Sequence, residues 1–127
     1  MKNEPYSNFI RGKIVAVCES VLREEIGVIA GSRRLKSLGF EVFNDHDADF
    51  MIFAVIDSET DHLPVGWERK NWSPEALKNK DQEIAEFESV CKEEAFKACR
   101  TLIQRLDMRD NQSNFIRAFF EQLSQDF

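Results

Sequence analysis

The feature that most constrains this fold is residues 75–106, which contain neither Gly nor Pro. Ser73 is a suitable N-cap, and Pro74 falls at the first helical position, where its missing N–H costs nothing. Apolar side chains then recur at helical spacing: Leu77, Ile84, Phe87, Cys91, Ala95, Ala98, Leu102 and Leu106. The pattern predicts one helix of about 50 Å. A helix of this length should either project beyond the core or bend near Phe87.

Helical spacing also appears before and after this segment. Ser7 is a candidate N-cap for a first helix with an inward stripe of Phe9, Ile10, Ile14, Val17, Val21 and Leu22. A last helix, capped by Asn111 or Ser113, would turn Phe115, Ile116, Phe119, Phe120 and Leu123 inward. A second helix is expected over Val28–Leu38, with Gly39 at its C′ position.

Residues 40–72 form an irregular and acidic centre. The apolar run 50–56 fits either a buried strand or a helix capped by Asp49, and its length does not decide between them. Residues 58–61 continue a helix more comfortably than a strand, which favours the helix. We therefore predict an all-α fold of four to five helices in a single domain over 1–127, with the α+β alternative of a short strand at 50–56.

Charge is distributed unevenly along the chain, whose net charge is −6. Residues 41–94 hold 15 acidic and 5 basic residues, whereas the flanking segments are slightly basic. Because nucleic-acid binders need a basic face, we expect no nucleic-acid partner. The longest apolar run is far shorter than the roughly 20 residues that cross a bilayer, so we expect no membrane partner. The unpatterned cysteines, Cys18, Cys91 and Cys99, predict a reduced core and a cytoplasmic protein.

Both histidines lie in the acidic centre, within Asp45-His46-Asp47-Ala48-Asp49 and Asp57-Ser58-Glu59-Thr60-Asp61-His62. Carboxylates and imidazoles are common metal ligands, which makes Asp45, His46, Asp47, Asp61 and His62 weak metal candidates. The spacing disfavours a calcium loop that starts at Asp45, because Phe50 stands where the sharp turn requires Gly and Ile56 where a Glu is required. The simpler interpretation is that these side chains cap helix ends, and we expect no cofactor.

Two tryptophans, Trp67 and Trp72, lie within a stretch of six residues that has loop character. Tryptophan is favoured at protein interfaces because it combines a large apolar area with an N–H donor. We expect Trp72, next to a helix start, to pin the loop to the core, and leave Trp67 open as a binding residue. The basic stretch 32–36 is interpreted as a solvated helix face turned toward the acidic centre, and Gly27 and Gly31 as positions of close helix packing.

The string Ile56-Asp57-Ser58-Glu59-Thr60-Asp61-His62-Leu63-Pro64-Val65-Gly66, with Arg69, Trp72 and Asp81 after it, resembles a motif of a family of small bacterial proteins. The similarity extends over about residues 25–106. No activity is established for that family, so the resemblance implies no catalytic role. It does imply that Asp57, Glu59, Asp61, His62 and Trp72 matter for folding or binding.

Three functions remain open. The first is a non-enzymatic module, such as an immunity-type inhibitor, whose acidic surface meets a basic protein through Asp57, Glu59, Asp61, His62, Trp67 and Trp72. The second is a small metal-assisted enzyme using Asp57, Glu59, Asp61 and His62. The third is an oligomerisation module whose long helix is the interface, in which charges at Ile84 or Phe87 would separate the subunits.

Overall fold

The structure, a computed structural model, describes residues 4–44 and 46–107. The regular secondary structure of these residues is entirely helical, with no strand. The helices are α1 (Glu4–Leu22), α2 (Val28–Val42), α3 (Met51–Glu59) and α4 (Pro74–Leu106). Two 3-10 turns, η1 (Ala48–Phe50) and η2 (Trp67–Asn71), precede α3 and α4. The helix predicted at 50–56 is confirmed and the alternative strand is wrong. The last helix predicted from Asn111 or Ser113 lies outside the described residues.

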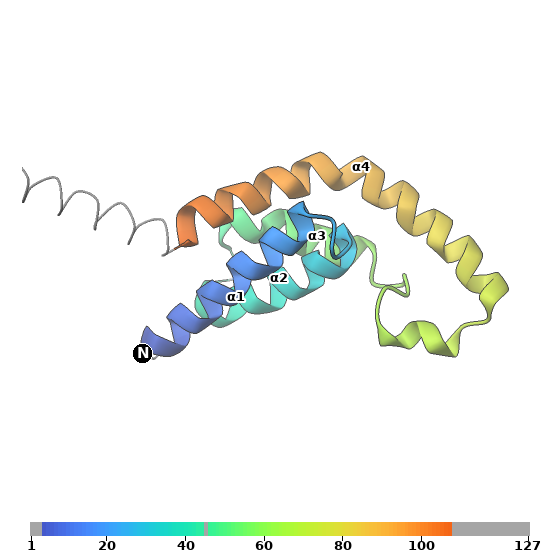
Figure 1. Cartoon of the computed structure of the whole chain (residues 1–127), viewed down its shortest axis with the longest axis horizontal. Coiled ribbons are helices and arrows are strands. Elements are labelled where there is room, and N and C mark those ends of the chain that lie inside the picture. The colour runs from blue at the N-terminus through green and yellow to red at the C-terminus, as the bar shows by residue number, and fades with distance from the viewer. Residues whose placement is uncertain (1–3, 45, 108–127) are drawn as a thin grey trace, which may run out of the picture.

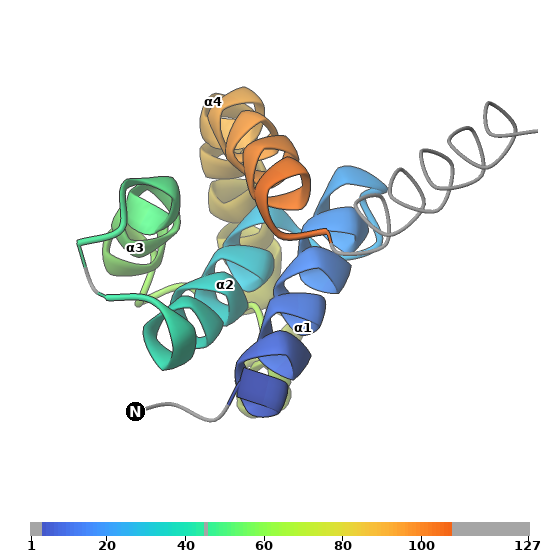
Figure 2. The same ribbon diagram turned by 90° about the vertical axis from the view of Figure 1, so that its left-hand side faces the viewer.

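Helices α1 and α2 lie side by side and antiparallel, α4 crosses over them, and α3 flanks α2 on the side away from α1 (Figures 1 and 2). Contacts at the two ends fix the antiparallel pairing. Tyr6 near the start of α1 hydrogen-bonds Glu41 near the end of α2. At the other end, Gly31 packs so closely on Val21 that a Cβ there would lie 2.4 Å from the valine methyl. Close packing was predicted for Gly31, and this contact confirms it.

The core lies where α1, α2, α3 and the second half of α4 meet. Its fully buried side chains include Ile14, Ile29, Leu35, Phe53, Ile56 and Leu102. Cys18 of α1 and Cys99 of α4 are also fully buried as free thiols. The hydrogen bond to Cys99, together with burial, raises the pKa of Cys18, so this thiol stays protonated. The buried pair therefore behaves as the small core hydrophobes that the sequence predicted.

Two helix ends differ from the prediction. Helix α1 begins at Glu4, so Ser7 lies inside it rather than at its cap. Phe9 is 58% exposed because the buried face of α1 runs through Ile10, Ile14, Cys18 and Val21. Helix α2 continues past Gly39 to Val42. Gly39 is a packing residue instead, since a Cβ at this position would lie 2.7 Å from the Phe50 ring.

The start of α3 also differs from the prediction that Asp49 caps it. The cap belongs to η1, where the Asp47 side chain accepts a hydrogen bond from the Asp49 N–H at 3.1 Å. Phe50 then occupies the position before α3 without a side-chain cap. The capping aspartate is Asp47 rather than Asp49 because a 3-10 turn precedes α3.

Helix α4 confirms the long helix and its cap, since Ser73 Oγ accepts from the Ala76 N–H at 3.1 Å. Its buried residues, Ala95, Cys99, Leu102 and Leu106, all lie in the second half. The first half extends past the other helices toward η2 (Figure 1), as one of the two predicted alternatives requires. Ile84, Phe87 and Cys91 are only partly buried there.

Candidate functional site

The predicted binding residues lie at the end of α3 and in the segment 60–72 that joins α3 to α4, which we call the Trp67 loop. The loop starts where α3 stops. Thr60 is fully buried and its Oγ1 donates to the Ile56 carbonyl at 2.6 Å. Leu63 and Pro64 are buried just after it, so two apolar residues anchor this end of the loop to the core.

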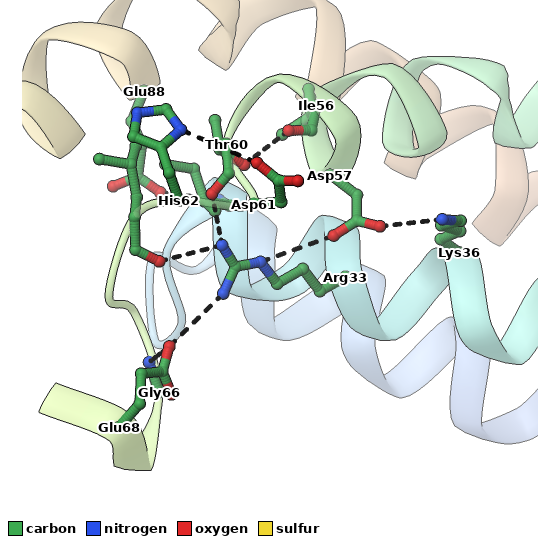
Figure 3. Close-up of polar contacts among 12 residues, drawn as sticks. Arg33, Lys36, Ile56, Asp57, Thr60, Asp61, His62, Gly66, Glu68 and Glu88 are labelled. Carbon is green, nitrogen blue, oxygen red and sulfur yellow. Dashed lines mark hydrogen bonds and ion pairs between the residues drawn. The ribbon is translucent and has the colours of Figure 1, made fainter.

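Arg33 of α2 holds the start of the Trp67 loop (Figure 3). Its Nη2 donates to the carbonyl oxygens of Thr60 and Leu63 at 2.5 and 3.0 Å. The same guanidinium lies 3.6 Å from Asp57 and 3.7 Å from Glu68. A cation at the carboxyl end of α3 also complements the helix dipole. The sequence predicted a basic helix face turned toward the acidic centre, but not this role in holding backbone.

Arg69 of η2 fixes the other end of the loop to α4. Its two terminal nitrogens form a bidentate pair with Asp81 at 2.6 and 2.9 Å. Nη1 also donates to the Pro64 carbonyl at 2.9 Å. The hydrogen bond from Arg69 lowers the pKa of Asp81, and Asp81 in turn raises the pKa of Arg69. Because a bidentate pair restricts orientation as well as distance, η2 is held in a defined position.

His62 bridges the loop to α4 at the surface. Its Nε2 lies 3.1 Å from Glu83 and its Nδ1 lies 3.9 Å from Asp61. The hydrogen bond with His62, followed by that with Lys80, lowers the pKa of Glu83. His62 is therefore engaged with carboxylates on both sides while about half of its side chain stays exposed.

The carboxylates of the predicted site point in different directions. Asp57 faces α2, where Lys36 Nζ lies 3.0 Å away and Arg33 also contacts it. Glu59 and Asp61 are exposed, and the Asp61 side chain is 81% exposed. The structure thus brings Asp61 together with His62, while Asp57 is neutralised within the fold. Fewer carboxylates of the predicted site are therefore available at the surface than the sequence suggested.

The first acidic cluster is also paired internally. Arg105 of α4 binds Asp47 through two contacts of 3.0 and 2.9 Å, and binds Asp49 at 2.6 Å. The hydrogen bond from Arg105 lowers the pKa of Asp47. His46 is exposed, and its backbone N–H donates to Asn44. Asp45 lies outside the described residues. Within residues 4–44 and 46–107, no three His, Cys, Asp or Glu side chains are grouped to hold a metal ion.

The two tryptophans differ in exposure. Trp67 is 77% exposed, and Lys70 Nζ lies 5.4 Å from its ring centroid. Trp72 is 36% exposed, and its backbone N–H donates to the Arg69 carbonyl at 3.1 Å. Trp72 is neither in the buried core nor among the side chains packed against it, so the prediction that it pins the loop to the core is wrong; Leu63 and Pro64 are the buried residues of the loop. Trp67 is therefore an aromatic side chain presented to solvent from a fixed backbone.

Comparisons of the chain with protein-family models, with curated proteins and with solved structures found no significant match. The family resemblance around residues 56–66 therefore stays a prediction. In the described part of the chain, no helix combines the length and apolar character needed to cross a membrane.

Proposed function

We propose that this chain is a non-enzymatic protein-binding module that engages a basic partner through the Trp67 loop. The observation that carries the proposal is Trp67 itself, which is 77% exposed on a segment held by Arg33 and Arg69. Interfaces concentrate their binding energy in a few residues, of which tryptophan is among the most frequent. A held loop also loses little conformational freedom on binding, which favours affinity.

Charge and ring chemistry support a basic partner. Glu59 and Asp61 are exposed beside the loop, and neither forms an ion pair with Lys or Arg among the described residues. The Trp67 ring already contacts one cation, Lys70, at 5.4 Å. Its other face offers a similar cation–π contact to a lysine or arginine of the partner. Within this class, we favour an immunity-type inhibitor that covers a basic enzyme surface. Exposed carboxylates would speed its association with such a surface.

The metal-assisted alternative receives no comparable support. It requires Asp57, Glu59, Asp61 and His62 to converge on one ion. Asp57 contacts Lys36 and Arg33, and His62 contacts Glu83. Because two of the four side chains are engaged elsewhere, they do not form a preorganised ligand set.

The proposal is tested by capturing partners on the immobilised full chain from an extract of the cells that encode it. We expect a bound protein whose retention falls at least tenfold with Trp67→Ala and with Asp61→Lys, and which is released by salt because exposed charges are screened. Phe40→Ala and Glu4→Lys are matched controls, since both positions are exposed on other helices. These two variants should retain the partner.

A fluorescence measurement then locates the contact. Trp72→Phe leaves Trp67 as the only tryptophan in the chain. Its emission should shift to shorter wavelength when the captured protein is added, because the ring leaves water. If every variant captures the same proteins equally, or if Trp67 emission does not change on binding, the proposal is wrong.

A further inference from the structure

An open groove with a volume of about 590 Å³ lies between α1 and α2. We call it the basic groove, and its lining residues are Lys13, Ala16, Val17, Arg33, Arg34, Ser37 and Leu38. The packing of α1 on α2 explains its presence. The helices touch closely at Gly31 and Val21, while the small side chains of Ala16 and Ser37 leave space further along.

The groove is positively charged on a chain with a net charge of −6. Its described lining contains three cations and no carboxylate. The Arg33 guanidinium is held by the Trp67 loop, but Arg34 forms no ion pair with any described residue. Lys13 lies 4.9 Å from the Phe9 ring centroid rather than beside a carboxylate. An apolar floor between two available cations is suited to an apolar side chain surrounded by acidic ones.

The same chain carries a surface of that description on α4. Val90 is 85% exposed, the most exposed large apolar side chain of the described residues. Glu86, Glu93 and Glu94 lie three or four positions from it and therefore surround it on the helix surface. Glu93 and Glu94 have no ion-pair partner within the described ranges. We call these four residues the Val90 face.

We propose that the Val90 face of one copy docks into the basic groove of a second copy. Val90 enters the apolar floor, and the surrounding glutamates meet Lys13 and Arg34. This differs from the oligomer predicted from Ile84 and Phe87, because those two side chains are partly buried against the core. Val90 is free of that packing, and α4 arches over the bundle in Figure 1.

The groove and the Val90 face point away from each other. Val90 is nine residues before the buried Cys99, about 180° around α4 from it, so it faces away from α1. Cys18 of α1 contacts Cys99 of α4, and Ala16 lies about 200° around α1 from Cys18 at 100° per residue. The groove therefore opens away from α4, and one copy offers its groove while the next offers its Val90 face. Such head-to-tail contacts form rings or open chains rather than two-fold dimers.

Sedimentation of the full chain tests the proposal. At about 10 mM salt, where the screening length is about 30 Å, the average mass should rise above 14.8 kDa as the concentration approaches about 1 mM. At about 150 mM salt the association should weaken because the charges are screened. Val90→Asp and Arg34→Glu should each weaken it at least tenfold. Val55→Asp, at a 51% exposed position on α3 outside both surfaces, should not.

Mixing the two variants gives the decisive result. Val90→Asp keeps an intact groove, and Arg34→Glu keeps an intact Val90 face, so an equal mixture should form a dimer that cannot extend. Far-ultraviolet circular dichroism of each variant should match that of the native chain, since both positions are exposed. A native chain that stays monomeric at about 1 mM in low salt overturns the proposal. So does association that survives either variant, or a mixture that remains monomeric.

Discussion

At the scale of single residues, Gly12 and Gly31 lie inside helices with opposite surroundings. A Cβ on Gly12 would have no heavy atom within 4 Å, whereas one on Gly31 would lie 2.4 Å from a Val21 methyl. Replacing an exposed helical glycine with alanine stabilises a helix by about 0.5–1 kcal/mol. We expect Gly12→Ala to raise the free energy of unfolding by this amount. Gly31→Ala should lower it by about 1–3 kcal/mol because α1 and α2 are forced apart.

Urea unfolding of the two variants measures both effects. The intrinsic helix propensity of alanine is the same at either site, so the difference between them isolates the packing of α1 on α2. If Gly31→Ala stabilises the protein as Gly12→Ala does, α1 and α2 do not pack as closely at Val21 as the structure describes.

Glu88 of α4 provides an N-terminal cap for a helix 59 residues away in sequence. Its Oε2 accepts from the Ile29 N–H at 2.8 Å, near the start of α2, where Gly27 has no side chain to do so. We expect Glu88→Ala to lower the free energy of unfolding by about 1 kcal/mol, the usual cost of losing a cap. Amide exchange at Ile29 should become faster. Glu86→Ala, at an exposed position half a turn away, is the control and should leave Ile29 exchange unchanged.

At the scale of elements, α4 was predictable because its signals are local. Ser73, Pro74 and the apolar stripe lie in one continuous segment, and each acts within a few residues. The prediction that Gly39 ends the second helix is wrong because its role depends on a long-range contact. A glycine near an expected helix end is a common C-cap signal, but here its role is set by Phe50, which only the tertiary fold brings next to it.

The Trp67 loop depends on two long-range arginine contacts, so it can be loosened without unfolding the helices. Arg69→Ala removes the pair with Asp81 and the bond to the Pro64 carbonyl. We expect amide exchange in residues 60–72 to become about tenfold faster, because local opening then costs less free energy. Helical content should not change. Lys70→Ala, the next residue in the same turn, should leave the exchange near its native rate.

If Arg69→Ala leaves exchange in the loop unchanged, Arg33 and the buried Leu63 and Pro64 hold the loop without a contribution from Arg69. Partner capture by Arg69→Ala then gives a second comparison. A held loop predicts weaker capture even though Trp67 is still present, because ordering the loop must accompany binding.

At the scale of the whole molecule, the sequence located the acidic residues but not which of them are available. Asp57 and Asp61 are four positions apart and similar in sequence context. Asp57 faces Lys36 and Arg33 of α2, whereas Asp61 faces solvent. That distinction depends on how α2 packs against α3, and no local pattern encodes it. The same holds for Arg105, whose partners lie nearly 60 residues earlier.

The contact of Arg105 with Asp47 and Asp49 joins the start of α3 to the end of α4. It also makes the free energy of unfolding depend on pH. The pKa of Asp47 is lowered in the folded chain, so its contribution is fully present above the ordinary carboxyl pKa of about 3.9. It is lost as the pH falls through the lower, folded pKa. We expect Asp47→Asn to lower the free energy of unfolding by about 1 kcal/mol at pH 7.

The difference between the native chain and Asp47→Asn should stay constant from pH 7 to about 5 and shrink below about 4, because protonation then removes the charge from the native residue as well. Urea unfolding at several pH values measures it. Glu59→Gln is the matched control, since Glu59 is exposed and lacks an ion-pair partner in the described part of the chain. If Asp47→Asn does not lower the free energy of unfolding at pH 7, or if its effect grows as the pH falls, Arg105 does not couple the two ends of the bundle through charge.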